Sequence, residues 1–375
     1  MNRSTDELAL ESRVSGARPE YRFATADGVC SERSFRTAEL LLVESLWDAD
    51  PGRLLVPEAN YGVVGTVLAA RASSAHLTES SARAARLCER NARRNDADVE
   101  ISTVADLTTL GGTFETVAYA PKPYTPLAVG TQRIADALSV LGPGDELFLA
   151  AAPRTGLARY ETHLDEMAAG VERRATRGDW RLLVATRPDS FDPPTYVSPR
   201  TIRPEIDGAT LELVTVPGLF SPTALDDGTR LLLETATVED GERVLDPCCG
   251  YGAIGAYAGL AADCEVWLTD DDRVATACAE RSLRASGVDA IVVTADCTAG
   301  VADRTFDRVL CNPPTHASDG VLAELFAGIA DVLARGGELT TVHHRDLDLR
   351  NHLSEFDRIE TRRTGAEHVV LSAIK

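Results

Sequence analysis

Residues 243–255, RVLDPCCGYGAIG, organise the second half of the chain. Two apolar residues lead into the carboxylate Asp246 and predict a short buried strand that ends there. Gly250, Gly252 and Gly255 predict a tight loop followed by a helix, because glycine lets the backbone turn sharply and lets a ligand lie against it. The N-terminus of that helix offers free N–H groups. The segment indicates a nucleotide-binding α/β unit, and folds of several chemistries share such a glycine pattern.

Polar residues follow two further apolar segments of the same half. Asp270 comes directly after EVWLT (265–269). An acidic side chain at the end of a second strand suits the hydroxyls of a ribose. The segment FDRVLC (306–311) predicts another strand, and it leads into Asn312 and two prolines.

The turn that begins at Asn312 offers acceptors for an amino group. Two consecutive prolines stiffen the turn, so the amide of Asn312 and the carbonyl of Pro313 are held in place. Both can accept hydrogen bonds from one exocyclic NH2 of a planar base or amide, and the nitrogen lone pair then points at an incoming methyl group. The pattern indicates in-line methyl transfer from a sulfonium, promoted by positioning and electrostatics without a strong base.

The chain is internally repeated. RLLVPEANYGVVG (53–65) aligns with residues 243–255, and self-similarity at a fixed distance indicates two copies of one structural unit. Further matches are 28–31 with 218–221, 76–79 with 267–270, 114–121 with 306–313, 141–147 with 333–339 and 163–166 with 352–355. Short apolar segments alternate with helical ones in both copies. This alternation predicts two α/β domains, each with a mostly parallel sheet and helices on both faces.

We assign the two domains to residues 20–188 and 196–375. Residues 189–195 lie between them and are rich in proline, which predicts a linker. The polar start of the chain, residues 1–19, predicts a disordered tail.

The two copies differ where chemistry is expected. Three positions lose their functional residue in the first copy: Asp246 aligns with Val56, Gly250 with Asn60, and Asn312 with Ala120. The first copy keeps two loop glycines and two acids, which are Gly62, Gly65, Glu79 and Asp106. These changes narrow the path of a cofactor and remove the amide that would hold an amine. We therefore predict that the first copy is degenerate and non-catalytic.

The first copy also carries five arginines in one helical segment: Arg83, Arg86, Arg90, Arg93 and Arg94. The spacing of the first four places them along one face of a helix. One interpretation is a stripe that binds RNA phosphates. The alternative is a solvated helix face paired with Glu79 and Glu89.

The charge composition is strongly acidic. The formal net charge is −20, and the only lysines are Lys122 and Lys375. Abundant Asp and Glu with so little Lys is typical of proteins adapted to molar salt, where the Debye length falls to about 3 Å. An ordinary acidic cytosolic protein is the alternative.

Cysteine usage and hydropathy indicate the cellular compartment in which the protein is expected. The eight cysteines contain no Cys-x-x-Cys pair, so we expect buried reduced thiols, no disulfide framework and no metal. No apolar segment approaches the roughly 20 residues of a membrane span, and the polar start lacks the apolar core of a signal peptide. These features predict a soluble cytoplasmic protein.

Taken together, these motifs resemble the ribosomal RNA guanine-N2 methyltransferase family (the RsmC/RlmG type), a branch of the class I S-adenosylmethionine-dependent methyltransferases. The likeness includes a degenerate N-terminal copy, a catalytic C-terminal copy, and the segments PGLFS (217–221) and LDDGT (225–229). It implies two tandem Rossmann-like domains, S-adenosylmethionine as cofactor, and methylation of guanine in ribosomal RNA. It also implies ribosomal RNA or a ribosomal subunit as partner, with the N-terminal copy helping to bind RNA.

The resemblance further implies roles for individual residues of the second copy. The cofactor site would comprise Asp246, Gly250, Gly252, Gly255 and Asn312, with Asp270 on the ribose hydroxyls and Asp296 with Cys297 at the adenine. Asn312 and Pro313 would hold the target amine.

The chain departs from this family at Thr315. The family has an aromatic residue there, next to Pro314, which would stack on a flipped base. Phe220 and His316 are candidates to supply the stacking. His316 has the alternative role of a turn histidine that hydrogen-bonds the loop.

Other functions fit part of the pattern. Adenine N6 in nucleic acid and a protein glutamine both present an NH2 to the same kind of turn, although those families usually place Tyr, Phe or Trp after the prolines. A protein that binds RNA or the cofactor without catalysis is a third possibility. We expect a monomer in which the two copies pack as an internal pseudo-dimer.

Overall fold

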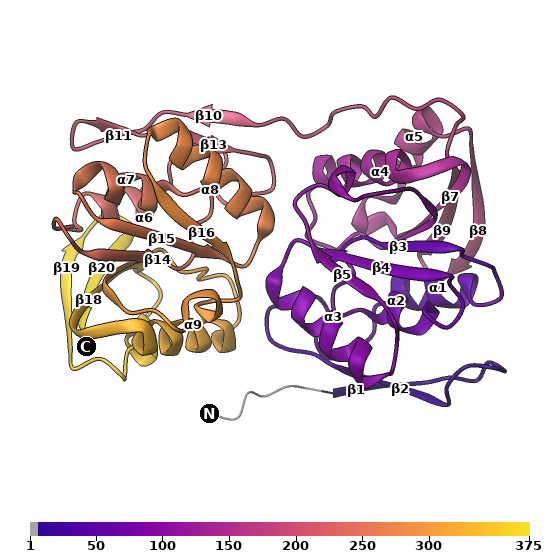
Figure 1. The fold of residues 1–375 in the computed structure, drawn as a ribbon, viewed down its shortest axis with the longest axis horizontal. Coiled ribbons are helices and arrows are strands. Elements are labelled where there is room, and N and C mark those ends of the chain that lie inside the picture. Colours follow the sequence, from indigo (N-terminus) through magenta and orange to yellow (C-terminus); the bar gives the residue numbers. More distant parts are fainter. Residues whose placement is uncertain (1–6) are drawn as a thin grey trace. The chain divides into compact units, whose positions relative to one another are not determined.

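The computed structural model describes residues 7–375, which divide between Val197 and Ser198 into two compact units. Figure 1 traces the chain through both of them. Residues 187–199 contain no helix or strand. The end of this stretch packs on the first unit, because the N–H of Tyr196 donates to Gln132 Oε1 at 2.6 Å. The division therefore falls two residues after the predicted start of the second domain.

The N-terminal segment forms a strand. β1 (Glu7–Glu11) pairs antiparallel with β2 (Glu20–Ala24), and Leu8 and Leu10 pack against the core of the first unit. The prediction of a disordered tail is wrong for this strand, because alternate leucines give a short polar segment one apolar face. Residues 1–6 lie outside the described part of the chain.

The first unit contains a seven-stranded sheet with the strand order β5-β4-β3-β6-β7-β9-β8. Its strands are β3 (Arg53–Val56), β4 (Ser74–Glu79), β5 (Glu100–Thr103), β6 (Phe114–Tyr119), β7 (Leu141–Ala151), β8 (Gly170–Arg177) and β9 (Trp180–Thr186). Its helices are α1 (Thr37–Leu46), α2 (Val63–Leu68), α3 (Ala82–Arg94), α4 (Leu127–Val140) and α5 (Leu157–Met167), with short 3-10 turns η1 (Leu107–Thr109) and η2 (Pro153–Thr155).

The second unit repeats this order as β16-β15-β14-β17-β18-β20-β19. Its strands are β14 (Arg243–Asp246), β15 (Glu265–Asp270), β16 (Ala290–Thr294), β17 (Phe306–Cys311), β18 (Leu333–His344), β19 (Arg358–Thr364) and β20 (His368–Ile374). Its helices are α6 (Asp227–Leu233), α7 (Ala253–Ala261), α8 (Arg273–Ser286) and α9 (Asp319–Val332), with η3 (Ala299–Val301) and η4 (Leu349–His352). Short pairs β10 (Arg200–Ile202) with β13 (Leu213–Thr215) and β11 (Glu205–Ile206) with β12 (Ala209–Thr210) precede this sheet.

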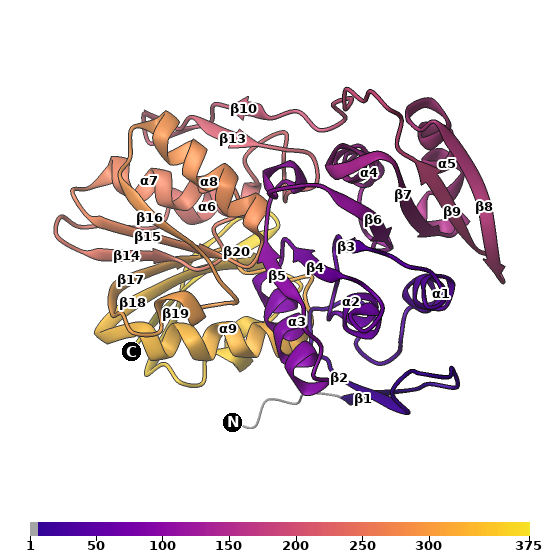
Figure 2. The same ribbon diagram turned by 45° about the vertical axis from the view of Figure 1, so that its right-hand side comes forward.

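Helices cover both faces of each sheet, as Figure 2 shows for α8 and α9 of the second unit. In that unit, α6, α7 and α8 share one core with Val244 and Leu310. The other core joins α9 to Leu245 and Val309, the neighbours of those residues along the same strands. Because successive strand residues point to opposite faces, apolar strands of this kind are buried on both sides. The two mixed sheets confirm the predicted pair of α/β domains.

The sheet topology brings the predicted polar residues of the second unit to one edge. β14 runs parallel to β15 on one side and to β17 on the other. Asp246, Asp270 and Asn312 stand at or just after the carboxyl ends of these three strands. Ligands of open α/β sheets bind outside the carboxyl ends of the strands, where the strand order reverses. All eight cysteines are free thiols. None of the helices between residues 7 and 375 has the length and hydropathy to cross a bilayer.

Candidate active site

Asp246 is a buried carboxylate with 1% of its surface exposed. Among residues 7–375, no group makes a well-aligned hydrogen bond to either of its oxygens. Burial raises the pKa of Asp246 well above its usual range, the charge of Asp270 adds to this rise, and the backbone amides of Cys248 and Gly255 oppose it. Leaving a buried carboxylate without a partner costs free energy. Asp246 is thus placed as an acceptor for a polar ligand.

Glycine is required at the three loop positions for different structural reasons. Gly250 has φ of +51°, and a Cβ there would meet none of the described atoms within 4 Å, so a ligand can lie against its backbone. A Cβ on Gly252 would lie 3.0 Å from Ala279 Cβ, and one on Gly255 would lie 2.6 Å from Leu268 Cδ2. Gly252 and Gly255 therefore let α7 pack closely on its neighbours, and Gly250 is the glycine that faces open space.

Asp270 ends β15 and is fixed by the backbone around it. Its Oδ2 accepts a hydrogen bond from Gly250 N at 2.8 Å, and its Oδ1 accepts one from Asp272 N at 2.9 Å. Burial raises the pKa of Asp270 to about 7, although these two bonds act in the opposite direction. The carboxylate lies directly beside the open loop at Gly250, as an acceptor for ribose hydroxyls requires.

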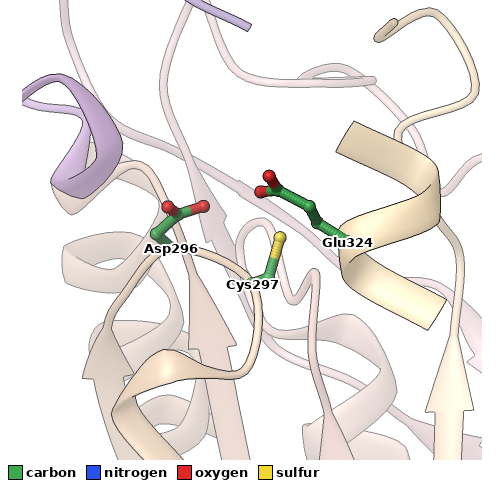
Figure 3. A group of neighbouring side chains, drawn as sticks. All are labelled: Asp296, Cys297 and Glu324. Atoms are coloured by element: carbon green, nitrogen blue, oxygen red, sulfur yellow. The ribbon is translucent and has the colours of Figure 1, made fainter. Parts of the chain in front are cut away.

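Asp296, Cys297 and Glu324 converge at the next strand end. Figure 3 shows the three side chains pointing toward one another, the first two from the segment after β16 and the third from α9. One ligand atom of each lies within 4.8 Å of the other two. The sequence did not reveal Glu324, because only folding brings α9 beside this loop. Asp296 is buried, and Cys297 and Glu324 are partly exposed. The predicted lack of a metal stays a prediction.

The turn after β17 contains short backbone hydrogen bonds. Thr315 N donates to Pro313 O at 2.8 Å, and Ala317 N donates to Pro314 O at 2.8 Å. A carbonyl oxygen has two lone pairs, so Pro313 O keeps one for a further donor. Pro313 is buried, whereas Asn312 is partly exposed. The turn therefore presents a fixed amide beside a fixed carbonyl.

The amide of Asn312 contacts the start of α6. Its Nδ2 donates to Thr229 Oγ1 at 2.8 Å and to Asp226 Oδ2 at 3.3 Å. Asp226 in turn caps α6, accepting a bond from Thr229 N at 2.8 Å. The sequence segment LDDGT contains both residues, but their contact with Asn312 became visible only in the structure.

Phe220 and His316 are both exposed, Phe220 to 59%. The loop of Phe220 is anchored, because the hydroxyl of Tyr251 donates to Ser221 O at 3.3 Å and lies 3.5 Å from Ala224 O. This loop leads directly into the cap of α6. Within the described chain, His316 makes no hydrogen bond to its loop, so the structure does not support its alternative role as a turn histidine.

The first unit fills the equivalent place with its own side chains. Asn60 has φ of +60° where the second unit has Gly250, and its amide bonds the backbone of Cys30 in both directions, at 3.1 and 2.8 Å. Glu79 accepts bonds from Asn60 N at 2.5 Å and from Lys122 Nζ at 2.9 Å. The side chains of Glu79 and Lys122 are only 1% and 11% exposed. The carboxylate that aligns with Asp270 is thus already neutralised.

Arg36 contacts the part of the first unit that corresponds to the turn at Asn312. It occupies the N-cap position of α1, the helix that corresponds to α6, but makes no side-chain capping bond there. Its guanidinium donates to Ala120 O at 2.9 Å and to Pro121 O at 2.6 Å, and it pairs with Glu39. Ala120 and Pro121 align with Asn312 and Pro313. These contacts agree with the prediction that the first copy is degenerate.

The arginines of α3 do not share one face. Four of them are exposed: Arg86, Arg90, Arg93 and Arg94. Arg83 is 5% exposed, and it donates to Asp27 O at 2.9 Å. The predicted stripe is therefore wrong at Arg83, because the first turn of α3 is buried against its own unit. The alternative pairing is correct for Glu89, which lies 3.7 Å from Arg93, and wrong for Glu79, whose carboxylate is buried on Lys122.

The sequence matches a protein-family model twice, over residues 20–183 and 210–372, and the model is described as the methyltransferase small domain. The chain belongs to this family. Both copies of the duplicated unit are methyltransferase domains by descent, which confirms the resemblance inferred from the motifs. The two matched regions also correspond to the two sheets of the structure.

Named relatives within this group are ribosomal RNA methyltransferases. The chain is 28% identical to ribosomal RNA large subunit methyltransferase G of Pseudomonas putida (strain GB-1), over 92% of this chain and 94% of that protein. It is 30% identical to the protein of the same name from Aeromonas salmonicida, over 58% of this chain, and spans only 59% of that relative's length. A solved structure of the T. thermophilus 16S rRNA N2 methyltransferase RsmC, in complex with AdoMet and guanosine, shares the fold with a TM-score of 0.82. It is 22% identical and covers 99% of this chain and 98% of that one.

Proposed function

We propose that this methyltransferase transfers the methyl group of S-adenosylmethionine to the exocyclic N2 amine of a guanine in ribosomal RNA. The observation that carries the proposal is the turn at Asn312, where an amide and a carbonyl stand side by side at the strand edge that also holds Asp246 and Asp270. Two acceptors for one amine, next to acceptors for a nucleoside, fit methyl transfer to an NH2 group.

The residues of the second unit fit S-adenosylmethionine, which supplies an electrophilic methyl group on its sulfonium. Asp246 offers a buried carboxylate that has no well-aligned partner within residues 7–375, and Gly250 leaves open space along the backbone. Asp270 would accept the ribose hydroxyls, and Asp296 with Cys297 would meet the adenine. The first unit lacks this fit, because Lys122 already occupies the acid that aligns with Asp270.

Asn312 and Pro313 would act on the target amine. Asn312 Oδ1 and Pro313 O each accept one N–H, which directs the nitrogen lone pair toward the methyl group. The same two dipoles stabilise the positive charge that develops on the nitrogen, and the proton leaves after transfer. Phe220, exposed on its anchored loop, would stack on the base in place of the missing aromatic residue at Thr315. Base stacking of this kind contributes roughly 1–3 kcal/mol.

The substrate class rests on two kinds of support. Relatives over most of the chain are named ribosomal RNA methyltransferases, and the exposed arginines of α3, Arg86, Arg90, Arg93 and Arg94, suit RNA phosphates. A cytoplasmic site of action, where ribosomal subunits assemble, and a monomeric state belong to the same proposal. Sedimentation would reveal a mass of twice the chain if the protein were a dimer.

The decisive experiment measures transfer of labelled methyl groups in molar potassium chloride, to total RNA and to ribosomal subunits at different stages of assembly. Nucleoside digestion identifies the product. We expect N2-methylguanosine in ribosomal RNA, and a loss of rate of about 100-fold or more in Asn312→Ala, the range seen when one preorganised transition-state contact is removed. Asn351→Ala is the matched control, because Asn351 is an exposed asparagine of the same unit.

Other labelled products would favour the other candidates. Methyladenine or labelled protein would move the assignment to adenine N6 or to a protein glutamine. Cofactor binding without transfer to any substrate would indicate a non-catalytic RNA- or cofactor-binding protein.

A further inference from the structure

Two residues at the start of α6 orient the amide of Asn312, and we propose that Asp226 and Thr229 are positioning residues for methyl transfer. The inference rests on the proposed function, because it concerns the group that would receive the target amine. The contacts are the bonds from Asn312 Nδ2 to Thr229 Oγ1 at 2.8 Å and to Asp226 Oδ2 at 3.3 Å.

The two contacts decide which end of the amide is available to substrate. A carboxamide has two N–H donors on nitrogen and an acceptor oxygen. The amide nitrogen of Asn312 faces both Thr229 Oγ1 and Asp226 Oδ2, and among residues 7–375 no group donates to Asn312 Oδ1. The reverse orientation would turn Oδ1 toward Asp226 Oδ2, an oxygen that already accepts two hydrogen bonds from Thr229. Asn312 therefore presents an acceptor, as an incoming NH2 requires.

The orienting pair is itself rigid. Asp226 Oδ2 accepts bonds from Thr229 N at 2.8 Å and from Thr229 Oγ1 at 3.3 Å. Thr229 is buried, with 7% of its surface exposed. Its hydroxyl hydrogen is directed at Asp226, so the oxygen lone pairs are free to accept from Asn312. The backbone of α6 thus fixes the amide through a closed triangle of hydrogen bonds.

The degenerate copy supplies an independent comparison within the same chain. The N-cap position of α1 holds Arg36, which aligns with Asp226 of the second unit but makes no side-chain capping bond. It too reaches the turn after the equivalent strand, β6, but as a donor to Ala120 O and Pro121 O. The N-cap position thus holds an acceptor in the copy that keeps the amide and a cation in the copy that lost it. In each copy, the residue at this position is matched to the groups that the turn presents.

The first test uses kinetics with Thr229→Val, which keeps the shape of the side chain and removes its hydroxyl. We expect kcat to fall by about 10- to 100-fold, a typical cost of misplacing a reacting group, while the Kd for S-adenosylmethionine stays within about twofold. Thr229→Ser should restore most of the rate. Thr108→Val in the first unit is the matched control, because the hydroxyl of Thr108 also bonds the aspartate that caps its helix.

The second test exchanges donor and acceptor. Asp226→Asn keeps a side chain able to cap α6, but its new N–H can pair with Asn312 Oδ1 and turn the amide around. Asn312→Asp places two carboxylates side by side. In the double variant, the new amide at position 226 donates to one oxygen of the new carboxylate at position 312, and the second oxygen remains available to the target amine. Its kcat should therefore be at least about 10-fold higher than that of either single variant. A purely structural role for Asp226 would give a double variant no better than the singles.

A third readout does not depend on activity. With 15N-labelled asparagine, the side-chain NH2 of Asn312 should exchange slowly with solvent in the wild type and rapidly in Thr229→Val, with exposed Asn351 as the fast reference. Fast exchange in the wild type, or unchanged kcat in Thr229→Val, would overturn the inference. The wild-type product separates the two hypotheses: if the enzyme methylates another NH2 substrate, the guanine assignment fails and the variants are scored on that substrate.

Discussion

Cofactor affinity should depend on pH through Asp270. Burial places its pKa at about 7 in the free protein, and only the ionised carboxylate is a full acceptor for two ribose hydroxyls. Below pH 7 the proton must leave before binding. Raising the pH from 6 to 8 increases the ionised fraction from about one tenth to about nine tenths, so the Kd for S-adenosylmethionine should fall by roughly 10-fold.

Calorimetry in buffers of different ionisation enthalpy measures both the affinity and the protons released. We expect the Asp270 carboxyl to release about 0.9 proton per cofactor at pH 6, half a proton at pH 7 and about 0.1 at pH 8. Asp270→Asn should bind more weakly and lose this component of the release. Equal proton release by the wild type and the variant would refute the assignment of the titration to Asp270.

Stability supplies a check without cofactor. Because the pKa is raised in the folded state, the protonated form stabilises the fold at low pH, and this contribution is lost as the pH rises through about 7. The free energy of unfolding of the wild type should therefore decline from pH 5 to pH 7 relative to Asp270→Asn and level off above it. A relative increase over that range would show that the carboxylate is stabilised, contrary to the structure.

Three further predictions concern the two copies of the site. In urea unfolding, Lys122→Met should destabilise the first unit by about 3–5 kcal/mol, because it leaves the charge of Glu79 buried without its partner. Adding Glu79→Gln should recover part of this loss, and an equal loss in the single and double variants would argue against the ion pair. Gly255→Ala should cost about 1–3 kcal/mol through overpacking, whereas Gly250→Ala should mainly weaken cofactor binding, and calorimetry with unfolding would separate the two effects. Asp246→Asn should stabilise the cofactor-free protein by about 1–3 kcal/mol in thermal unfolding and weaken cofactor binding. A loss of stability would contradict the description of Asp246 as a buried carboxylate that lacks a well-aligned partner within residues 7–375.

The sequence predicted the duplicated architecture because its determinants are local. Gly62 and Gly252 both have positive φ at the start of a helix, and apolar strand segments of matching length flank them in each copy. The aligned segments therefore predict the same strand, loop and helix in both copies. The family match and the two sheets of identical order confirm this prediction.

Contacts between distant segments were not predictable in the same way. The spacing of the arginines in α3 predicted one exposed face, yet Arg83 is buried on Asp27 because the side of a helix that packs inward depends on its neighbours. The partners of Asn312 lie more than 80 positions earlier, on α6, and Glu324 reaches the loop of Asp296 from α9. Such pairings depend on chain topology, for which a single sequence contains no direct signal.

The retained acid at the end of the second strand explains how one copy could lose its ligand and keep its fold. In the second unit this acid is Asp270, whose hydrogen-bond donors among residues 7–375 are backbone amides and whose pKa is raised by burial. Its ionised form therefore costs stability that cofactor binding would recover. In the first unit Glu79 has the same place, but Lys122 supplies the positive charge permanently. The first unit thus keeps the carboxylate of Glu79, which no longer has a ligand to bind, and neutralises it with its own Lys122. Lys122, one of only two lysines in the sequence, therefore replaces in part the stabilisation that a ligand would provide to the second unit.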